Sequence, residues 1–174
     1  MPAPFTLTKT DRRITLLALI VIVCDQITKW LVLRGIFLGD EITVIPGFFN
    51  LTHRVNTGAA WSQFSGHNAV LAIVAIVALA LLFRARFHFG AQRLFGQLAF
   101  GLVFGGIIGN LTDRILPGRH AVVDFLHFYM ARRGAGGVFD FPAFNVADSA
   151  ICVGVAIIIL LNWKEEPRTV TSDK

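Results

Sequence analysis

Two carboxylates that could share one proton stand in the second half of the chain, Asp124 in the apolar run 122–125 and Asp148 near the start of a long apolar segment. Two acids held close together resist ionising together, so one keeps its proton and the pair titrates as a unit. The charged member can take a proton from water, while the protonated member donates to a carbonyl and then to a leaving amine. This is the chemistry of an aspartic protease. A helix cap or a loop salt bridge is the ordinary structural alternative for each residue.

Further polar residues are predicted to gather at the same depth of the folded bundle as these two aspartates. Asp25 and Lys29 lie one helical turn apart, and Asp113 is followed at once by Arg114, so we expect two structural ion pairs that shape the site. Charged side chains inside a membrane are costly and usually mark function. The remaining polar residues expected at this level are Asn56, Asn110 and Asn145.

Other catalytic schemes find less support in the sequence. Ser149 has no histidine placed to activate it, and Cys24 lies in an apolar run without a neighbouring base. Asp124 with His127 could bind a metal, but two ligands alone give a weak signal. The sequence therefore predicts no metal and no cofactor.

Four long apolar segments must position these residues. Hydrophobic residues make up 55% of the 174, and charged residues only 16%, which is far below the share in soluble domains. In lipid the backbone must satisfy its own hydrogen bonds, so apolar runs of this length are expected to be helices. We predict an all-α membrane protein, a four-helix bundle forming one domain over residues 1–174. The expected spans are 14–33, 68–83, 94–111 and 146–163.

The basic residues predict how the bundle is oriented. Arginines and lysines cluster in the N-terminal tail, in the loop between the second and third spans, and in the C-terminal tail. These three segments fall on one side of a four-span topology, and by the positive-inside rule that side is the cytoplasm. Both termini are therefore expected in the cytoplasm, and the first span is read as a retained helix and not as a cleaved signal peptide. The basic residues sit at the ends of apolar segments and not in one patch, which argues against nucleic-acid binding despite a net charge of +5.

The two long loops, about 34–67 and 112–145, are expected on the outer side. Residues 41–45 and 48–55 flank Pro46-Gly47, which predicts two strands of a small sheet, whereas 132–137 is typical of a loop. Glycines four residues apart in the third span predict close helix packing. They are Gly101, Gly105 and Gly109. Cys24 and Cys152 are expected to be buried, inert thiols.

Five blocks of the chain, in this order and spacing, resemble the lipoprotein signal peptidases, also called signal peptidase II. The blocks are 25–29, 56–60, 109–114, 122–125 and 144–148. The resemblance implies four transmembrane helices, a small outer β-cradle, and an aspartate dyad of Asp124 and Asp148 near the outer face of the bacterial inner membrane. It implies an enzyme that cuts diacylglyceryl-modified prolipoproteins before the lipid-bearing cysteine, without metal or cofactor, and that globomycin inhibits. The polar residues named above, with Ala147 leaving room for substrate, correspond to the family's site shell.

Two stretches depart from the family pattern. Trp61 stands where phenylalanine is common, and residues 131–140 are longer than usual, a segment we expect to be surface loop. Two other functions stay open at this point. A small transporter or proton-relay protein would also need intramembrane Asp, Lys and Asn, but it needs them from face to face, and the inner halves of the four segments are apolar. A noncatalytic lipid or lipoprotein binder would not need both aspartates.

Overall fold

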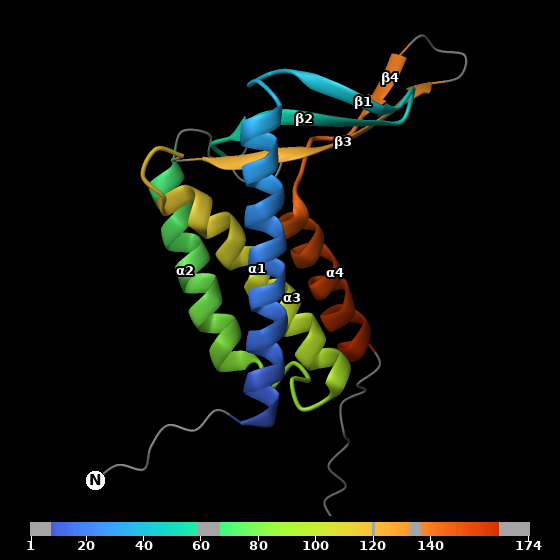
Figure 1. The fold of residues 1–174 in the computed structure, drawn as a ribbon. Coiled ribbons are helices and arrows are strands. Elements are labelled where there is room, and N and C mark those ends of the chain that lie inside the picture. The colour runs from blue at the N-terminus through green and yellow to red at the C-terminus, as the bar shows by residue number, and fades with distance from the viewer. Residues whose placement is uncertain (1–7, 59–66, 120, 133–136, 164–174) are drawn as a thin grey trace, which may run out of the picture.

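The computed structural model describes residues 8–58, 67–119, 121–132 and 137–163. Four helices lie side by side, and an antiparallel sheet crosses one end of the bundle (Figure 1). The helices are α1 Lys9–Gly35, α2 Asn68–Ala85, α3 Leu94–Ile115 and α4 Val146–Asn162. All four apolar segments expected to be helical are helical, so the predicted bundle is present.

Three of the described helices, α1, α2 and α3, are long and apolar enough to cross a membrane. The fourth, α4, is equally apolar but has only 17 residues in the described range. Large apolar side chains cover the outside of the bundle, for example Leu16, Ile73 and Leu160. An outside of this kind suits lipid and not water, so the chain is a membrane protein.

The helix α3 packs against both α1 and α4 at very short range. A Cβ added at Gly105 would lie 2.6 Å from the Cβ of Val21, and one at Gly101 would lie 2.8 Å from the Cβ of Leu17. These glycines therefore let α1 and α3 approach closely, as their spacing predicted. On the other side of α3, Gly106 meets the backbone of Ala147, a contact that the spacing did not reveal.

The sheet has four strands in the order β1-β2-β3-β4, all antiparallel. They are β1 Glu41–Ile45, β2 Phe49–Asn56, β3 Val122–Arg132 and β4 Gly137–Asp140. The predicted pair of strands around Pro46-Gly47 is confirmed. The prediction of a surface loop over 131–140 is wrong for both ends of that segment, because β3 continues to Arg132 and β4 pairs with it, Tyr129 facing Asp140. The middle of the predicted loop, 133–136, lies outside the described residues.

The sheet is fixed to the bundle by the end of α1. Val32 and Ile36 pack against Val123 and Phe125 of β3 in one buried cluster. This contact holds β3 over the end of the bundle at which α4 begins (Figure 1).

The two cysteines do not lie where we expected. Cys24 and Cys152 are free thiols exposed on the outside of the bundle. Because this outside suits lipid, apolar sequence around each cysteine reflects contact with the membrane and not burial within the protein.

Candidate active site

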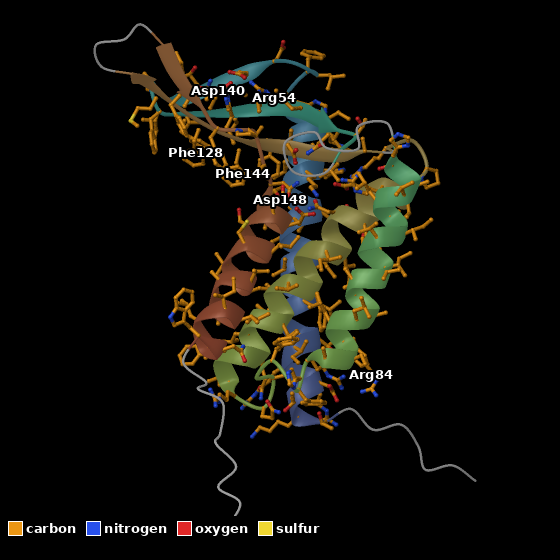
Figure 2. All side chains as sticks on the ribbon, turned by 180° about the vertical axis from the view of Figure 1, so that it is seen from behind. Arg54, Arg84, Phe128, Asp140, Phe144 and Asp148 are labelled. Carbon is orange, nitrogen blue, oxygen red and sulfur yellow. The ribbon has the colours of Figure 1, made fainter. Side chains whose placement is uncertain are left out.

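The two aspartates predicted to react reach the same place from different elements. Asp124 lies on β3 with 3% of its surface exposed. Asp148 lies in the first turn of α4, which begins directly beneath the sheet (Figure 2). The strand and the helix start therefore bring together two carboxylates that are separated by many residues in the chain.

Asn145 connects the two carboxylates. Its Nδ2 donates to Oδ1 of Asp124 at 2.7 Å, and its backbone N donates to Oδ2 of Asp148 at 3.2 Å. The side chain of Asn145 also accepts from the backbone N of Asp148 at 2.9 Å, which makes a capping box at the start of α4. One residue thus caps the helix and fixes both acids.

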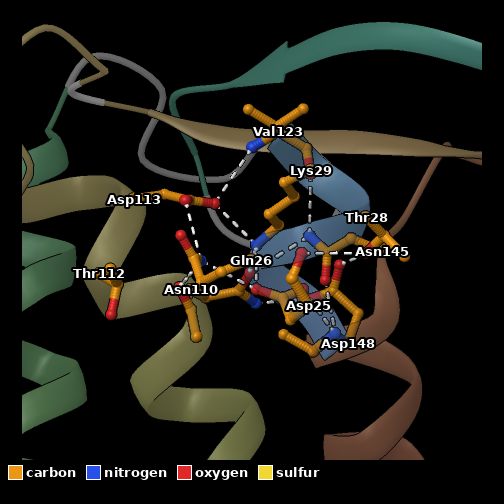
Figure 3. A network of polar contacts seen from close by, with 12 residues as sticks. Asp25, Gln26, Thr28, Lys29, Asn110, Thr112, Asp113, Val123, Asn145 and Asp148 are labelled. Carbon is orange, nitrogen blue, oxygen red and sulfur yellow. Dashed lines mark hydrogen bonds and ion pairs between the residues drawn. The ribbon is translucent and has the colours of Figure 1, made fainter. Parts of the chain in front are cut away.

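Asn110 supports this arrangement from α3. Its Nδ2 donates to Oδ1 of Asp148 at 2.7 Å, and its Oδ1 accepts from Asn145 Nδ2 at 3.2 Å and from Lys29 Nζ at 3.0 Å. Figure 3 shows the same side chains as one connected network. Asn110 therefore links the acid of α4 to a buried cation of α1.

Asn56 completes the surroundings of Asp124. Its Nδ2 donates to Oδ2 of Asp124 at 3.0 Å, so both carboxylate oxygens of Asp124 accept a hydrogen bond from an amide side chain. Burial, followed by the nearby negative charge of Asp148, raises the pKa of Asp124 to about 7, although the bonds from Asn56 and Asn145 act in the opposite direction. Asp124 can therefore carry a proton near neutral pH.

Lys29 is fully buried and is neutralised by two carboxylates. Its Nζ lies 2.8 Å from Oδ2 of Asp25 and 2.6 Å from Oδ2 of Asp113. The expected Asp25–Lys29 ion pair is confirmed. The expected pairing of Asp113 with the adjacent Arg114 is wrong, because successive residues of a helix point in different directions.

Arg119 and Gln26 belong to this network, and the sequence reading missed both. Arg119 Nη1 lies 2.6 Å from Oδ1 of Asp113 and 3.0 Å from Oε1 of Gln26. Gln26 Nε2 in turn donates to Oδ2 of Asp25 at 3.1 Å. The charges of buried Asp25, Asp113 and Lys29 and of half-buried Arg119 therefore balance. The only sequence feature that pointed to Gln26 is its place beside Asp25 in the block 25–29. Arg119 lies in none of the five blocks.

Arg114 has a separate role in the last turn of α3. It donates to the carbonyl of Gly58 at 2.6 Å and to Oδ1 of Asn68 at 2.8 Å. Gly58 follows Asn56 closely, and its own N donates to Asn56 Oδ1 at 2.9 Å. Arg114 thus fixes the segment that presents Asn56 to Asp124. Trp61 lies outside the described residues.

Ala147 is fully buried where α4 crosses α3. Its backbone N donates to Oδ1 of Asp25 at 3.0 Å, so a carboxylate of α1 meets the N-terminus of α4. A Cβ at Gly109 would lie 3.3 Å from the Cβ of Ala147. The small side chain therefore lets α4 approach α3 closely. Its expected role of leaving room for substrate stays a prediction.

His127, the weaker metal candidate with Asp124, points elsewhere. Its two ring nitrogens lie beside Glu41 and Asp140, and residues an odd number apart on a strand face opposite sides of a sheet. The part of the chain that the structure describes holds no cluster of three His, Cys, Asp or Glu residues suited to a metal ion.

Comparison with known proteins gives one consistent result. The family model described as signal peptidase (SPase) II matches residues 17–164. The lipoprotein signal peptidase of Anoxybacillus flavithermus is 41% identical over 155 residues, covering 88% of this chain and 86% of that protein. The lipoprotein signal peptidase of Bacillus pumilus is 37% identical over 160 residues, covering 90% and 97%.

Solved structures agree with the sequence comparison. A structure described as a bacterial membrane enzyme at 2.3 Å superposes with a TM-score of 0.75 at 36% identity, covering 92% of this chain and 93% of that one. A second bacterial membrane enzyme, at 1.9 Å, gives a TM-score of 0.72 at 38% identity, covering 88% and 94%. With most of its length matched by sequence and by structure, the chain belongs to the signal peptidase II family of membrane proteases, the lipoprotein signal peptidases.

Proposed function

We propose that this chain is an aspartic endopeptidase in which Asp124 and Asp148 are the catalytic pair. Its reaction is removal of the signal peptide from diacylglyceryl-modified prolipoproteins, with cleavage before the lipid-bearing cysteine. The observation that carries the proposal is the sharing of Asn145 by two carboxylates from distant parts of the chain. A structural ion pair would give each acid a cation, whereas here the direct partners of both are amides.

The two acids have different tasks at the start of the reaction. Asp148 lies in the first turn of α4, where the helix dipole favours the charged form, so it is the base. Asp124, whose pKa burial and then the charge of Asp148 raise to about 7, carries the shared proton. The charges around Lys29 balance one another and add no net charge beside the catalytic pair. The pair therefore holds one proton and one negative charge.

The reaction then uses one water molecule and no further group. Asp148 takes a proton from water as the oxygen attacks the scissile carbonyl, and Asp124 gives its proton to the carbonyl oxygen. Collapse of the resulting diol breaks the C–N bond. The proton held by Asp148 passes to the leaving amine, while the diol returns a proton to Asp124. Both acids thus end in their starting states.

The position of the pair suits a lipidated substrate. With four spans and both termini in the cytoplasm, the sheet end of the bundle faces outward from the bacterial inner membrane, as the basic loops predict. A precursor whose acyl chains lie in the outer leaflet carries its scissile bond near that surface. The pair can reach this bond and still draw water from outside. Globomycin-type inhibitors are expected to compete for the same place.

A transporter or proton relay is less well supported. Such a protein needs polar side chains from one face of the membrane to the other. Between buried Gln97 near the inner end of α3 and Gly109 at the level of Asp25, the helix carries only apolar residues and glycine. The polar network therefore ends partway through the bundle.

The decisive experiment is cleavage of a lipidated precursor by purified protein in lipid. Asp124→Asn and Asp148→Asn should each lower the rate by about 10² to 10⁴, the usual contribution of a positioned acid or base. Asp40→Asn, the same change at an exposed outer aspartate, is the matched control and should cleave normally. A normal rate in either dyad variant would overturn the assignment.

A further inference from the structure

The hairpin formed by residues 128–132 of β3 and by β4 extends sideways past α4 (Figure 1). It carries large apolar side chains that are mostly exposed. Their exposed fractions are 58% for Met130, 61% for Val138 and 56% for Phe139. An exposed group of this size on a strand pair usually marks a contact surface.

The apolar side chains divide between two faces. Alternation along β3 puts Asp124, Leu126, Phe128 and Met130 on one face. Phe139 pairs directly with Met130 and therefore shares that face. We call Phe128, Met130 and Phe139 the apolar face of the hairpin.

The opposite face of the hairpin is polar and is held by His127. Its Nε2 lies 2.5 Å from Oδ1 of Asp140, and its ring stacks on that of Tyr129. His127 Nδ1 lies 3.3 Å from Glu41 Oε1, so the imidazole sits between two carboxylates. By alternation from Asp140, Val138 belongs to this second face.

The two faces are directed toward different surroundings. Phe128 lies on the side of the sheet that faces the helices, and Asp140 lies on the other side (Figure 2). Phe128 stacks on Phe144 with ring centroids 5.8 Å apart, and Phe144 stands two residues before α4. The apolar face therefore adjoins the start of α4, a helix on whose outside Val153 and Leu160 are exposed.

A polar face turned away from the helices and an apolar aromatic face turned toward them are what an element at a membrane surface requires. We propose that the apolar face of the β3–β4 hairpin is a lipid-binding surface, immersed in the leaflet that surrounds the sheet end of the bundle. Met130 stands six residues from Asp124 on the same strand face, about 20 Å away at about 3.4 Å per residue. Lipid bound there would hold β3, and with it Asp124, at a fixed depth.

Two adjacent positions provide the test, and it requires no enzymatic activity. In a chain carrying Cys24→Ala and Cys152→Ala, Phe139→Cys and Val138→Cys are made separately, and each is labelled with a nitroxide. The proteins are placed in bilayers of phosphatidylethanolamine and phosphatidylglycerol. Collision with oxygen, which concentrates in lipid, is compared with collision with a water-soluble nickel chelate.

The label at 139 should favour oxygen and lie about 5–10 Å into the boundary between headgroups and acyl chains, the depth of known interfacial elements. The label at 138 should favour nickel. If Phe139→Cys disturbs the hairpin, Met130→Cys takes its place. Met130 lies across from Phe139 on the same face, so a label there should also favour oxygen. Equal access of nickel to 138 and 139 would overturn the proposal. So would spin–spin broadening at 139 that disappears on dilution with unlabelled chain, because a second copy would then cover this face.

Discussion

Asn145 Nδ2 lies 2.7 Å from Oδ1 of Asp124, across 21 residues of sequence. The same residue is the N-cap of α4 and accepts from the backbone N of Asp148. Helix capping and alignment of the two acids therefore depend on one side chain. These two roles can be separated, because a cap requires only a short side-chain oxygen, whereas the bond to Asp124 requires an amide N–H.

Asn145→Ser should keep the cap and lose the bond to Asp124, and Asn145→Ala should lose both. We expect the alanine variant to be less stable than the serine variant by about 1 kcal/mol, the usual value of an N-cap. Both should cleave a lipidated precursor much more slowly than the unaltered chain. Thermal unfolding in detergent and precursor cleavage measure the two effects. A fully active serine variant would show that the Asn145–Asp124 bond does not position the acids.

The pH dependence of cleavage should report the shared proton. Burial, and then the charge of Asp148, raise the pKa of Asp124 to about 7, so the pair loses its proton as the pH rises through that value. We expect kcat/KM to fall on this alkaline side. Asn56→Ala removes a bond that favours the charged form of Asp124, and the fall should therefore move to higher pH. An alkaline limb that stays in place in this variant would contradict the role given to Asp124.

Folding stability should depend on the same proton. The pKa of Asp124 is about 7 in the folded chain against an ordinary 3.8, so the folded state binds more protons than the unfolded state between these values. Its contribution to stability is therefore present below about pH 4 and is lost as the pH rises to about 7. Asp124→Asn removes this dependence. The stability of the variant relative to the unaltered chain should increase from pH 4 to 7 and then level off, as measured by unfolding at several pH values.

The sequence predicted the helices well because apolar runs in lipid have few alternatives to a helix. It placed their ends less well, since apolarity marks the part in lipid and not the whole helix. Thus α1 begins at Lys9, after the Thr8 cap, and α3 continues through Asp113 to Ile115. Strand β4 was missed because the glycines before and at its start are typical of a loop, and only its pairing with β3 shows a strand.

The polar site was partly predictable, for a related reason. The Asp25–Lys29 pair follows from helix geometry, so spacing alone revealed it. Asp113 pairs with Lys29 of another helix and with Arg119, which comes from beyond the end of α3 and depends on how the chain turns there. No spacing rule predicts a contact of that kind.

Lys29 should be among the most sensitive positions for stability. Lys29→Met leaves the fully buried carboxylates of Asp25 and Asp113 without their shared cation, and breaking a buried pair in this way costs about 3–5 kcal/mol. Arg54→Met breaks the Arg54–Glu41 pair, whose side chains are 44% and 32% exposed, and should cost less than about 1 kcal/mol. Unfolding of the two variants in detergent compares them. Equal losses would mean that Lys29 is not the centre of the buried network.

Gly105 should tolerate no side chain, because α1 and α3 are already in contact there. A Cβ at this position would lie 2.6 Å from Val21 Cβ and 2.8 Å from the carbonyl oxygen of Ala18, so the helices would have to separate. Gly105→Ala should destabilise the protein by about 1–3 kcal/mol, the usual effect of overpacking. Gly35→Ala is the matched control, since nothing lies within 4 Å of its added Cβ and it also stands in a helix. Thermal unfolding in one detergent should separate the two variants, and a Gly105→Ala protein as stable as Gly35→Ala would show that the bundle can widen at no cost. Because Asp25 extends from α1 to the start of α4, separation of α1 from α3 should also slow precursor cleavage in Gly105→Ala and leave Gly35→Ala unaffected.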